Sequence, residues 1–566
     1  MRVDLLSFVT FLPMIGAILL LFIDTERKEL IKRVAFAVLC LDFVFSVVLW
    51  FFVPSGNKFA SIQQGMVTSG PHPWIEPLQI SYFMGLDGIS LLLVLMTTFL
   101  APLVLLGAWE RMGGKVKGFC FCILLMQTGM LGAFMALDLF LFYIFWEVIL
   151  IPLYFLIGIW GGKNRAAATM KFLLYTLLGS VLMLVAILYI GVQYKTYNIL
   201  ELYSLHFSAK EQYWLFGCFA LAFLVRVPMF PFHTWLPETQ AEAPTAASVI
   251  LAGVLLKIGV YGFIRLGMPL FPDALAAFTQ PLMILAVIGV IYGALVAMVQ
   301  PDLKKLIAYA SISQLGLIML GLLVLNTNGV QGGILHMVNH GLSTGALFLM
   351  VGMLYERRQT RTIADFGGIA KTIPVFAFFF MVCTLSAIGL PGLNGFVGEF
   401  LILLGIFSAY KLYAIVAGAG LILSAVYMLW MYRRMMFGPI NNALNHTLKD
   451  LELREVGLLT VICVAMLWLG LAPGAFLNKM GPSVDSFIST AVKKTKRTHT
   501  SRLNTHKTLY RQVKVTSPSK SFEPRRDVRN GRVYASGPKA KLPKRTCAKK
   551  TSNVLAFNGK RMNGVR

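Results

Sequence analysis

Six ionisable side chains stand inside segments of the chain that are otherwise apolar: Glu147, Arg226, Lys257, His336, His340 and Glu399. Charged groups within a membrane are costly, and by default they mark ion pathways or proton relays. Glu147 lies in Phe145-Trp146-Glu147-Val148, where a carboxylate among apolar residues needs a nearby cation. Arg226 and Lys257 are the candidates for that cation. Together the six residues predict a row of titratable groups near the middle of a membrane.

Each of these residues also has a structural interpretation. Glu147 could be the fixed partner of an ion pair, and Lys257 could extend its aliphatic chain toward a membrane interface. Glu399 could be stabilised by the positive end of a helix dipole. His336 and His340 have the spacing of metal ligands on a helix, but no third ligand accompanies them, so a packed, hydrogen-bonded His336 is the alternative.

The cysteines give no sign of a redox centre. The chain contains 7 of them, scattered and mostly inside apolar runs. Cys120 and Cys122 come closest to a motif, but residues two apart point to different sides of a helix and no second pair accompanies them. We therefore expect neither a metal site nor an iron–sulfur cluster in this chain.

The elements that position the six residues must be membrane helices. Of the 566 residues, 57% are hydrophobic and 13% are charged, which is far more apolar than a soluble domain. A spanning helix needs about 20 mostly apolar residues. We predict an all-α, polytopic membrane protein with about 14 transmembrane helices, the first of them an uncleaved span. The predicted spans are 5–23, 34–53, 83–108, 118–136, 138–158, 168–193, 213–231, 245–266, 280–299, 303–325, 331–354, 374–405, 411–437 and 456–476.

Basic residues alternate with these spans. Clusters follow the odd-numbered spans: Arg27-Lys28, Lys115 with Lys117, Lys163 with Arg165, Lys304-Lys305, Arg357-Arg358 and Arg433-Arg434. The even-numbered loops hold only isolated positive charges: Lys58, Lys195, Lys210 and Arg265. Because basic loops stay on the inner side of a membrane, both ends of the helical core are predicted to lie outside.

Two segments would interrupt a helix near the middle of the membrane: Val225 to His233, which contains Pro228 and Pro231, and Ile388 to Phe396. Broken helices in corresponding parts of two halves are typical of inverted repeats with a transport site between them. Two ordinary proline kinks are the alternative. We predict two inverted five-helix repeats.

These features divide the chain into five parts: N-terminal helices (1–117), a first repeat (118–275), a second repeat (276–440), a C-terminal helix (441–492) and a tail (493–566). The tail holds 22 Lys and Arg against 2 Asp and Glu. A segment so polar and so charged is expected to be disordered. A functional tail and an accidental extension both remain open.

Several motifs resemble the antiporter-like membrane subunits of respiratory complex I. They are Phe145-Trp146-Glu147, Pro228 to Glu238 with Ala243-Pro244-Thr245, Asp302 to Tyr309 with Ser311, His340-Gly341-Leu342-Ser343 and Pro391 to Phe400. The resemblance extends from about residue 5 to 480 and is greatest to the M-type subunits, because the related L and N types carry lysine at the position of Glu399.

The resemblance implies proton-channel roles for Glu147, Arg226, Lys257, His340 and Glu399. The family usually has lysine in place of Arg226, and arginine effectively never deprotonates. The family also often has histidine at the two positions that Gln240 and Gln314 occupy in this chain. Any proton relay at those two positions would rely on water.

The resemblance further implies proton translocation coupled to quinone reduction by NADH. This chain would bind no cofactor itself, and NAD, FMN, iron–sulfur clusters and quinone would sit on partner subunits. The expected partners are neighbouring antiporter-like subunits and the lipid bilayer, without nucleic acid, in a bacterial or mitochondrial inner membrane. The alternatives are a subunit of a multi-component sodium/proton antiporter, the membrane arm of a hydrogenase-type complex and a structural membrane scaffold with inert ion pairs.

Overall fold

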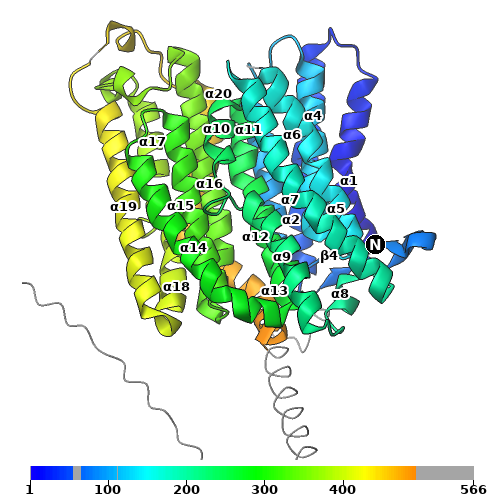
Figure 1. Ribbon diagram of the computed structural model, residues 1–566. Coiled ribbons are helices and arrows are strands. Elements are labelled where there is room, and N and C mark those ends of the chain that lie inside the picture. The colour runs from blue at the N-terminus through cyan, green and yellow to red at the C-terminus, as the bar shows by residue number, and fades with distance from the viewer. Residues whose placement is uncertain (1, 55–65, 111, 441, 493–566) are drawn as a thin grey trace, which may run out of the picture. The chain divides into compact units, whose positions relative to one another are not determined.

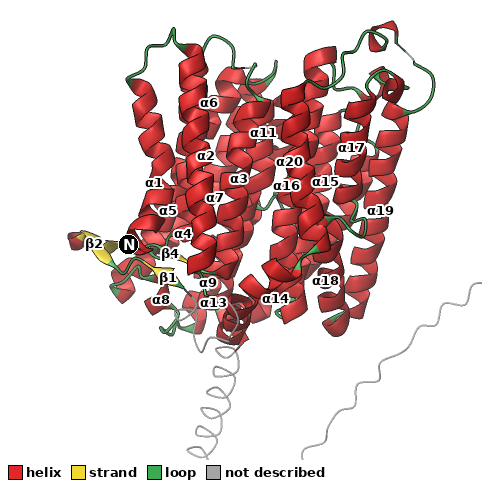
Figure 2. Ribbon diagram, turned by 180° about the vertical axis from the view of Figure 1, so that it is seen from behind, coloured by secondary structure: helices red, strands yellow, loops and turns green. Residues whose placement is uncertain are grey.

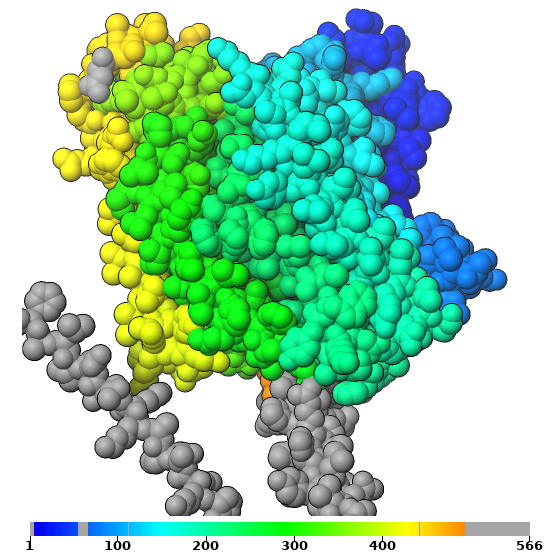
Figure 3. Space-filling model, in the orientation of Figure 1, coloured from blue at the N-terminus to red at the C-terminus, as the bar shows by residue number. Residues whose placement is uncertain are grey.

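The apolar segments form helices that stand side by side, from α1 (Arg2–Leu21) at one edge to α19 (Lys411–Met436) at the other (Figures 1 and 2). The computed structural model describes residues 2–54, 66–110, 112–440 and 442–492. Successive parts of the chain follow one another across the face seen in Figure 3. The predicted basic tail and Lys58 lie outside the described residues.

The predicted membrane-helical fold is confirmed. Of the helices in the described residues, 11 are long and apolar enough to cross a membrane, and three shorter ones are also apolar. Besides α1 and α19, the labelled helices are α2 (Lys28–Phe52), α3 (Gly88–Gly107), α4 (Val116–Met135), α5 (Leu139–Val148), α6 (Leu150–Trp160), α7 (Arg165–Tyr194), α8 (Ile199–Leu202), α9 (Ala209–Arg226), α10 (Trp235–Glu242), α11 (Thr245–Ile250), α12 (Leu256–Gly262), α13 (Met268–Leu270), α14 (Pro272–Met298), α15 (Leu303–Leu323), α16 (Thr327–Arg358), α17 (Pro374–Ala387), α18 (Asn394–Ala409) and α20 (Leu453–Leu471). Residues 474–492 are helical as well.

Helix α16 is the centre of the packing. It contacts α3, α11, α15, α17, α18 and α20, and its most apolar stretch is entirely buried. Asn326 caps its start by accepting a hydrogen bond from the Gly329 amide, 2.8 Å away. At Gly341 an added Cβ would meet the Met96 sulfur and the Gly253 carbonyl. Small residues of this kind let membrane helices approach closely.

Both predicted interruptions are present. Helix α9 ends at Arg226, and the chain becomes helical again at Trp235. Helix α17 ends at Ala387, and α18 begins at Asn394. Proline lacks the N–H that a helix needs in the first segment. Gly389 has a φ of 73° in the second, which a residue with a side chain rarely adopts. The predicted span 374–405 is therefore two short helices.

Several local features were not predicted. Four short strands lie between α2 and α3: β1 (Val67–Thr68) pairs with β4 (Gly85–Leu86), and β2 (His72–Ile75) pairs with β3 (Ile80–Tyr82). Two π-helical turns, η3 (Leu251–Leu255) and η4 (Phe263–Gly267), flank α12. Short 3-10 turns occupy Glu76–Leu78, Ile363–Asp365, Ile369–Lys371 and Ala443–Asn445.

Arg265, which was predicted to be an isolated positive charge in an outer loop, instead lies buried in η4 and forms an ion pair with the carboxylate of Asp87. Asp87 also caps α3 by accepting hydrogen bonds from the Ile89 and Ser90 amides at 3.1 and 2.9 Å. The Arg265 Nε donates to the Tyr261 hydroxyl at 3.1 Å. This cluster therefore joins the start of α3 to the end of α12.

We expect Asp87→Ala to reduce the free energy of unfolding by about 3–5 kcal/mol, because it leaves the buried guanidinium of Arg265 without its anion. Thermal unfolding of the purified protein in detergent measures the change. Glu110→Ala is the matched control, since it removes an exposed carboxylate that pairs with Arg454 at 3.0 Å and should cost less than about 1 kcal/mol. Equal effects of the two substitutions would contradict a stabilising role for the buried pair.

Candidate functional site

Glu147 lies one residue before the end of α5, at the junction with α6. Pro152 has no N–H to donate back toward that turn, so the helix is interrupted there. A Cβ at Gly132 of α4 would overlap the Phe145 ring. The missing side chain therefore lets α5 pack directly on α4, and this close packing holds the partly buried Glu147.

Arg226 is buried at the end of α9. Its guanidinium carbon lies 4.3 Å from the centre of the Trp146 ring, and its Nη2 donates to the Trp146 carbonyl at 3.4 Å. It interacts electrostatically with Glu147, but among the described residues no ion pair within 4.0 Å joins Glu147 to Arg226 or Lys257. A Cβ at Gly259 would meet the Arg226 side chain at 3.0 Å, so Arg226 packs on α12 beside the turn that carries Lys257.

Lys257 is completely buried and contacts His340 across the helix interface. Its Nζ lies 2.7 Å from His340 Nδ1 and also donates to the Ala252 carbonyl in the preceding π-helical turn. A Cβ at Gly341 would lie 2.8 Å from the Gly253 carbonyl. The two glycines therefore allow η3 and α16 to approach closely enough for the lysine to reach the imidazole.

His336 and Glu399 are linked through Gln314 of α15. The His336 Nε2 lies 3.0 Å from Gln314 Oε1, and Gln314 Nε2 donates to Glu399 Oε1 at 3.3 Å. Glu399 is buried in α18 against the second helix interruption. A Cβ at Gly389 would overlap its carboxylate, so a glycine is required at this position.

A cavity of about 20 Å³ lies between the two histidines, lined among others by Gln314, Asn339 and Ser343. Such a volume is enough for a water molecule. Three polar atoms of the residues that line this cavity have no hydrogen-bond partner in the described structure: His336 Nδ1, His340 Nε2 and Asn339 Oδ1. Buried polar atoms are nearly always satisfied by protein or water. A water in this cavity would therefore join the two imidazoles, whose ring centres are 6.5 Å apart.

The structure thus assembles four of the six predicted residues, Lys257, His336, His340 and Glu399, into one buried row. Glu147 and Arg226 lie together beside Trp146 as a separate pair. Sequence analysis did not identify Gln314 as the link between His336 and Glu399. The feature that could have identified Gln314 is a glutamine within an apolar span, at a position where the antiporter-like subunits often have histidine. No group of three potential metal ligands is present in the part of the chain that the structure describes.

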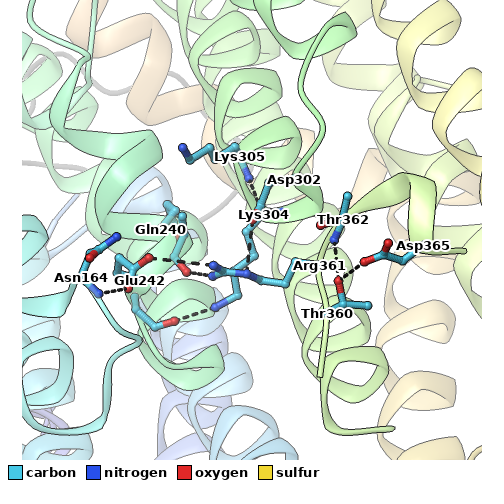
Figure 4. A network of polar contacts seen from close by, with 12 residues as sticks. Asn164, Gln240, Glu242, Asp302, Lys304, Lys305, Thr360, Arg361, Thr362 and Asp365 are labelled. Atoms are coloured by element: carbon cyan, nitrogen blue, oxygen red, sulfur yellow. Dashed lines mark hydrogen bonds and ion pairs between the residues drawn. The ribbon is translucent and has the colours of Figure 1, made fainter. Parts of the chain in front are cut away.

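A second polar network, shown in Figure 4, includes residues that line a cavity of about 690 Å³. Arg361, which follows α16, makes ion pairs with Asp302 at 3.3 Å and Glu242 at 3.9 Å, and it donates to the Ala241 carbonyl. Glu242 also accepts a hydrogen bond from the Asn164 amide at 2.9 Å. Because these residues belong to loops predicted to lie inside, the cavity opens on the predicted inner side.

A family model described as NADH:quinone oxidoreductase/Mrp antiporter, TM, matches residues 136–467, which is more than half of the chain. The chain belongs to this family. It is 42% identical to the NADH-ubiquinone oxidoreductase chain 4 of Arabidopsis thaliana, covering 84% of this chain and 95% of that protein. It is 41% identical to the NADH-quinone oxidoreductase subunit M of Rhodobacter capsulatus, over 85% and 96% of the two chains.

Solved structures agree with membership of the NADH:quinone oxidoreductase/Mrp antiporter family. A chain of respiratory complex I from Thermus thermophilus, 32% identical, superposes with a TM-score of 0.77 over 87% of this chain and all of that one. The Mrp complex of Dietzia has a TM-score of 0.75 over 87% of this chain and 99% of the matched one, at 22% identity. That second likeness shows a shared fold. The resemblance seen in the sequence motifs is confirmed.

We expect Gly389→Ala to displace the Glu399 carboxylate, because the added methyl group would occupy its position. Gly392→Ala is the matched control: Gly392 also has a positive φ, of 93°, but no atom lies within 4 Å of its added Cβ. Both changes incur the backbone penalty of about 1–2 kcal/mol. The carboxyl band in infrared spectra, assigned with Glu399→Gln, should shift only in Gly389→Ala, and an unchanged band there would contradict the close contact.

Proposed function

We propose that this chain is a proton-translocating membrane subunit of an NADH-quinone oxidoreductase, and that it performs no redox chemistry itself. The observation that carries the proposal is the buried row from Lys257 through His340, His336 and Gln314 to Glu399. Exchangeable groups in a membrane interior are the expected components of a proton path. The relatives named as subunits of NADH-quinone and NADH-ubiquinone oxidoreductases support the assignment to that complex.

The hydrogen bonds along this row run in one direction. A charged Lys257 has only donors, so it donates to His340 Nδ1 and leaves the His340 proton on Nε2, facing the cavity. At the other end, Gln314 donates its amide proton to Glu399 and accepts from His336 Nε2 through its oxygen. His336 Nδ1 is then an acceptor that also faces the cavity. A single water can complete the chain from the ammonium to the carboxylate.

Movement of a proton along this row would alter the charge on Lys257 and Glu399 in turn. In a low-dielectric interior, a change of charge on one group alters the proton affinity of its neighbours. The histidines can accept a proton on one nitrogen and release one from the other. An amide cannot do the same readily, so exchange between His336 and Glu399 past Gln314 needs water. The cavity beside Gln314 supplies space for it.

Proton uptake is proposed to occur through the 690 Å³ cavity on the predicted inner side. Lys304 lines this cavity and donates from its buried Nζ to the Ala243 carbonyl at 2.6 Å. Both residues belong to the motifs that identified the family. The ion pairs of Arg361 with Glu242 and Asp302 join loops of the two proposed repeats along the lining of this cavity.

The finer architecture is also a proposal. It comprises fourteen spans, with inverted repeats at 118–275 and 276–440 flanked by helices at 1–117 and 441–492. The matching interruptions after α9 and α17 support it. NAD, FMN, iron–sulfur clusters and quinone would be bound by partner subunits. Neighbouring membrane subunits of complex I are the partners, in a bacterial or mitochondrial inner membrane.

Gln314→Leu should lower NADH-driven proton translocation to about a tenth or less, a barrier change of about 1.4 kcal/mol or more. The leucine leaves His336 and Glu399 without their link. Gln314→His should retain translocation, because an imidazole can pass a proton. Acidification of inverted membrane vesicles measures the effect, and NADH oxidation by the same vesicles is measured separately. Normal acidification with Gln314→Leu would remove Gln314 from the path.

Lys257→Ala and Lys257→Arg should both lose most proton translocation in a complex that still assembles. Alanine removes the charge, whereas arginine keeps the charge but cannot release a proton. Tagged complex purified with its redox subunits and placed in liposomes allows both variants to be compared. Lys371→Ala, which changes an exposed lysine, is the control. Full activity of Lys257→Arg would show that a fixed charge is sufficient at this position.

A further inference from the structure

A carboxyl group outside the proposed path is buried in the middle of α2. Asp42 has no exposed surface, and neither does Gln127 of α4, which faces it. Gln127 Nε2 donates a hydrogen bond to Asp42 Oδ2. Neither residue belongs to the motifs that identified the family. Within the described residues, the hydrogen bond of the Asp42 side chain goes to Gln127 and not to the row from Lys257 to Glu399.

Two oxygens of this pair have no hydrogen-bond partner in the described structure: Asp42 Oδ1 and Gln127 Oε1. With Asp42 ionised, both oxygens are acceptors without a donor. The nearby hydroxyl of Ser46 is already engaged with Thr98 at 2.6 Å and with the Phe43 carbonyl at 2.7 Å. No cation pairs with Asp42 among the described residues. An ionised carboxylate would therefore be buried with a single hydrogen bond, which is strongly unfavourable.

We propose that Asp42 binds a proton on Oδ1 and forms a neutral acid–amide pair with Gln127. One proton gives both unpartnered oxygens a hydrogen bond, because the new O–H of Asp42 donates to Gln127 Oε1. Gln127 Nε2 continues to donate to Asp42 Oδ2. A bound sodium ion would also neutralise the charge, but it needs several oxygen ligands. In the described structure the unpartnered side-chain oxygens of this pair are two, Asp42 Oδ1 and Gln127 Oε1. The proton alone satisfies every polar atom of the pair.

The pair fixes α2 to α4, and α4 in turn supports the turn that carries Glu147. Two residues beyond Gln127, a Cβ at Gly129 would overlap the Ile149 side chain, and one at Gly132 would overlap Phe145. These contacts lie on either side of Glu147. Asp42 is therefore a positioning residue for Glu147. This consequence rests on the proposed function, whereas the protonated state of Asp42 does not.

Infrared spectroscopy of the assembled complex, prepared with isotopically labelled aspartate, tests the bound proton. Subtraction of the Asp42→Asn spectrum from the wild-type spectrum should show the carbonyl stretch of one protonated carboxyl, present in neutral and mildly alkaline buffer and unchanged by sodium. If the substitution Asp42→Asn removes bands of an ionised carboxylate and no band of a protonated carboxyl, the proposal is overturned. A band that appears or disappears with sodium would assign the site to that ion instead.

Rescue by the matched amide separates positioning from proton transfer. Asp42→Val removes both hydrogen bonds and should reduce assembled complex or NADH-driven translocation severalfold, whereas Asp42→Asn keeps one donor and one acceptor and should restore both to within about twofold. An assembled Asp42→Asn complex that fails to translocate protons, or one that fails to assemble, would overturn the static pair. If wild-type vesicles translocate no protons, the proposed function fails while the infrared result still stands.

Discussion

The hydrocarbon of a membrane offers no water to a polar group, so each buried charge in this protein depends on partners held within the protein. The ammonium of Lys257 is held by the Ala252 carbonyl and by His340. The guanidinium of Arg226 is held by the face and the carbonyl of Trp146. Regular helices keep their carbonyls for their own backbone, so spare acceptors occur where a helix is irregular. This is why Lys257 follows a π-helical turn, and why Arg226 donates to a carbonyl in the last turn of α5.

Close approach of the helices is the second requirement, and glycine residues allow it beside the titratable side chains. Gly253 and Gly341 bring η3 against α16, so that Lys257 reaches His340. A Cβ at Gly398 would meet the backbone of His336, which brings α18 against α16 in the same way. These glycines sit beside the titratable residues because side-chain contacts of hydrogen-bond length require backbones closer than larger residues permit.

Local chemistry made some of these features predictable. Proline and glycine marked both helix interruptions, and isolated charges marked the buried row. The partners were not predictable, because Lys257 and His340 are 83 positions apart and the cost of a buried charge does not identify which distant group offsets it. The π-helical turns were also missed, because no residue type encodes them. The buried Asp42 was missed although it lies in the predicted span 34–53 and carries the same signal, a charge in an apolar segment, as the six residues of the site. The boundaries of the repeats stay a prediction.

The separate pair of Glu147 and Arg226 differs chemically from the buried row that extends from Lys257 to Glu399. Arginine does not exchange protons, so Arg226 acts on Glu147 through its fixed charge, and the two side chains make no direct ion pair. From Lys257 to Glu399, by contrast, each titratable group has a neighbour within hydrogen-bond distance or faces the small cavity. In the proposed function, proton exchange therefore belongs to this second stretch. Glu147 and Arg226 are suited to setting the electrostatic field at Lys257, where Gly259 brings Arg226 against α12. A permanent charge suits that role, because Arg226 can alter the proton affinity of Lys257 without binding or releasing a proton itself.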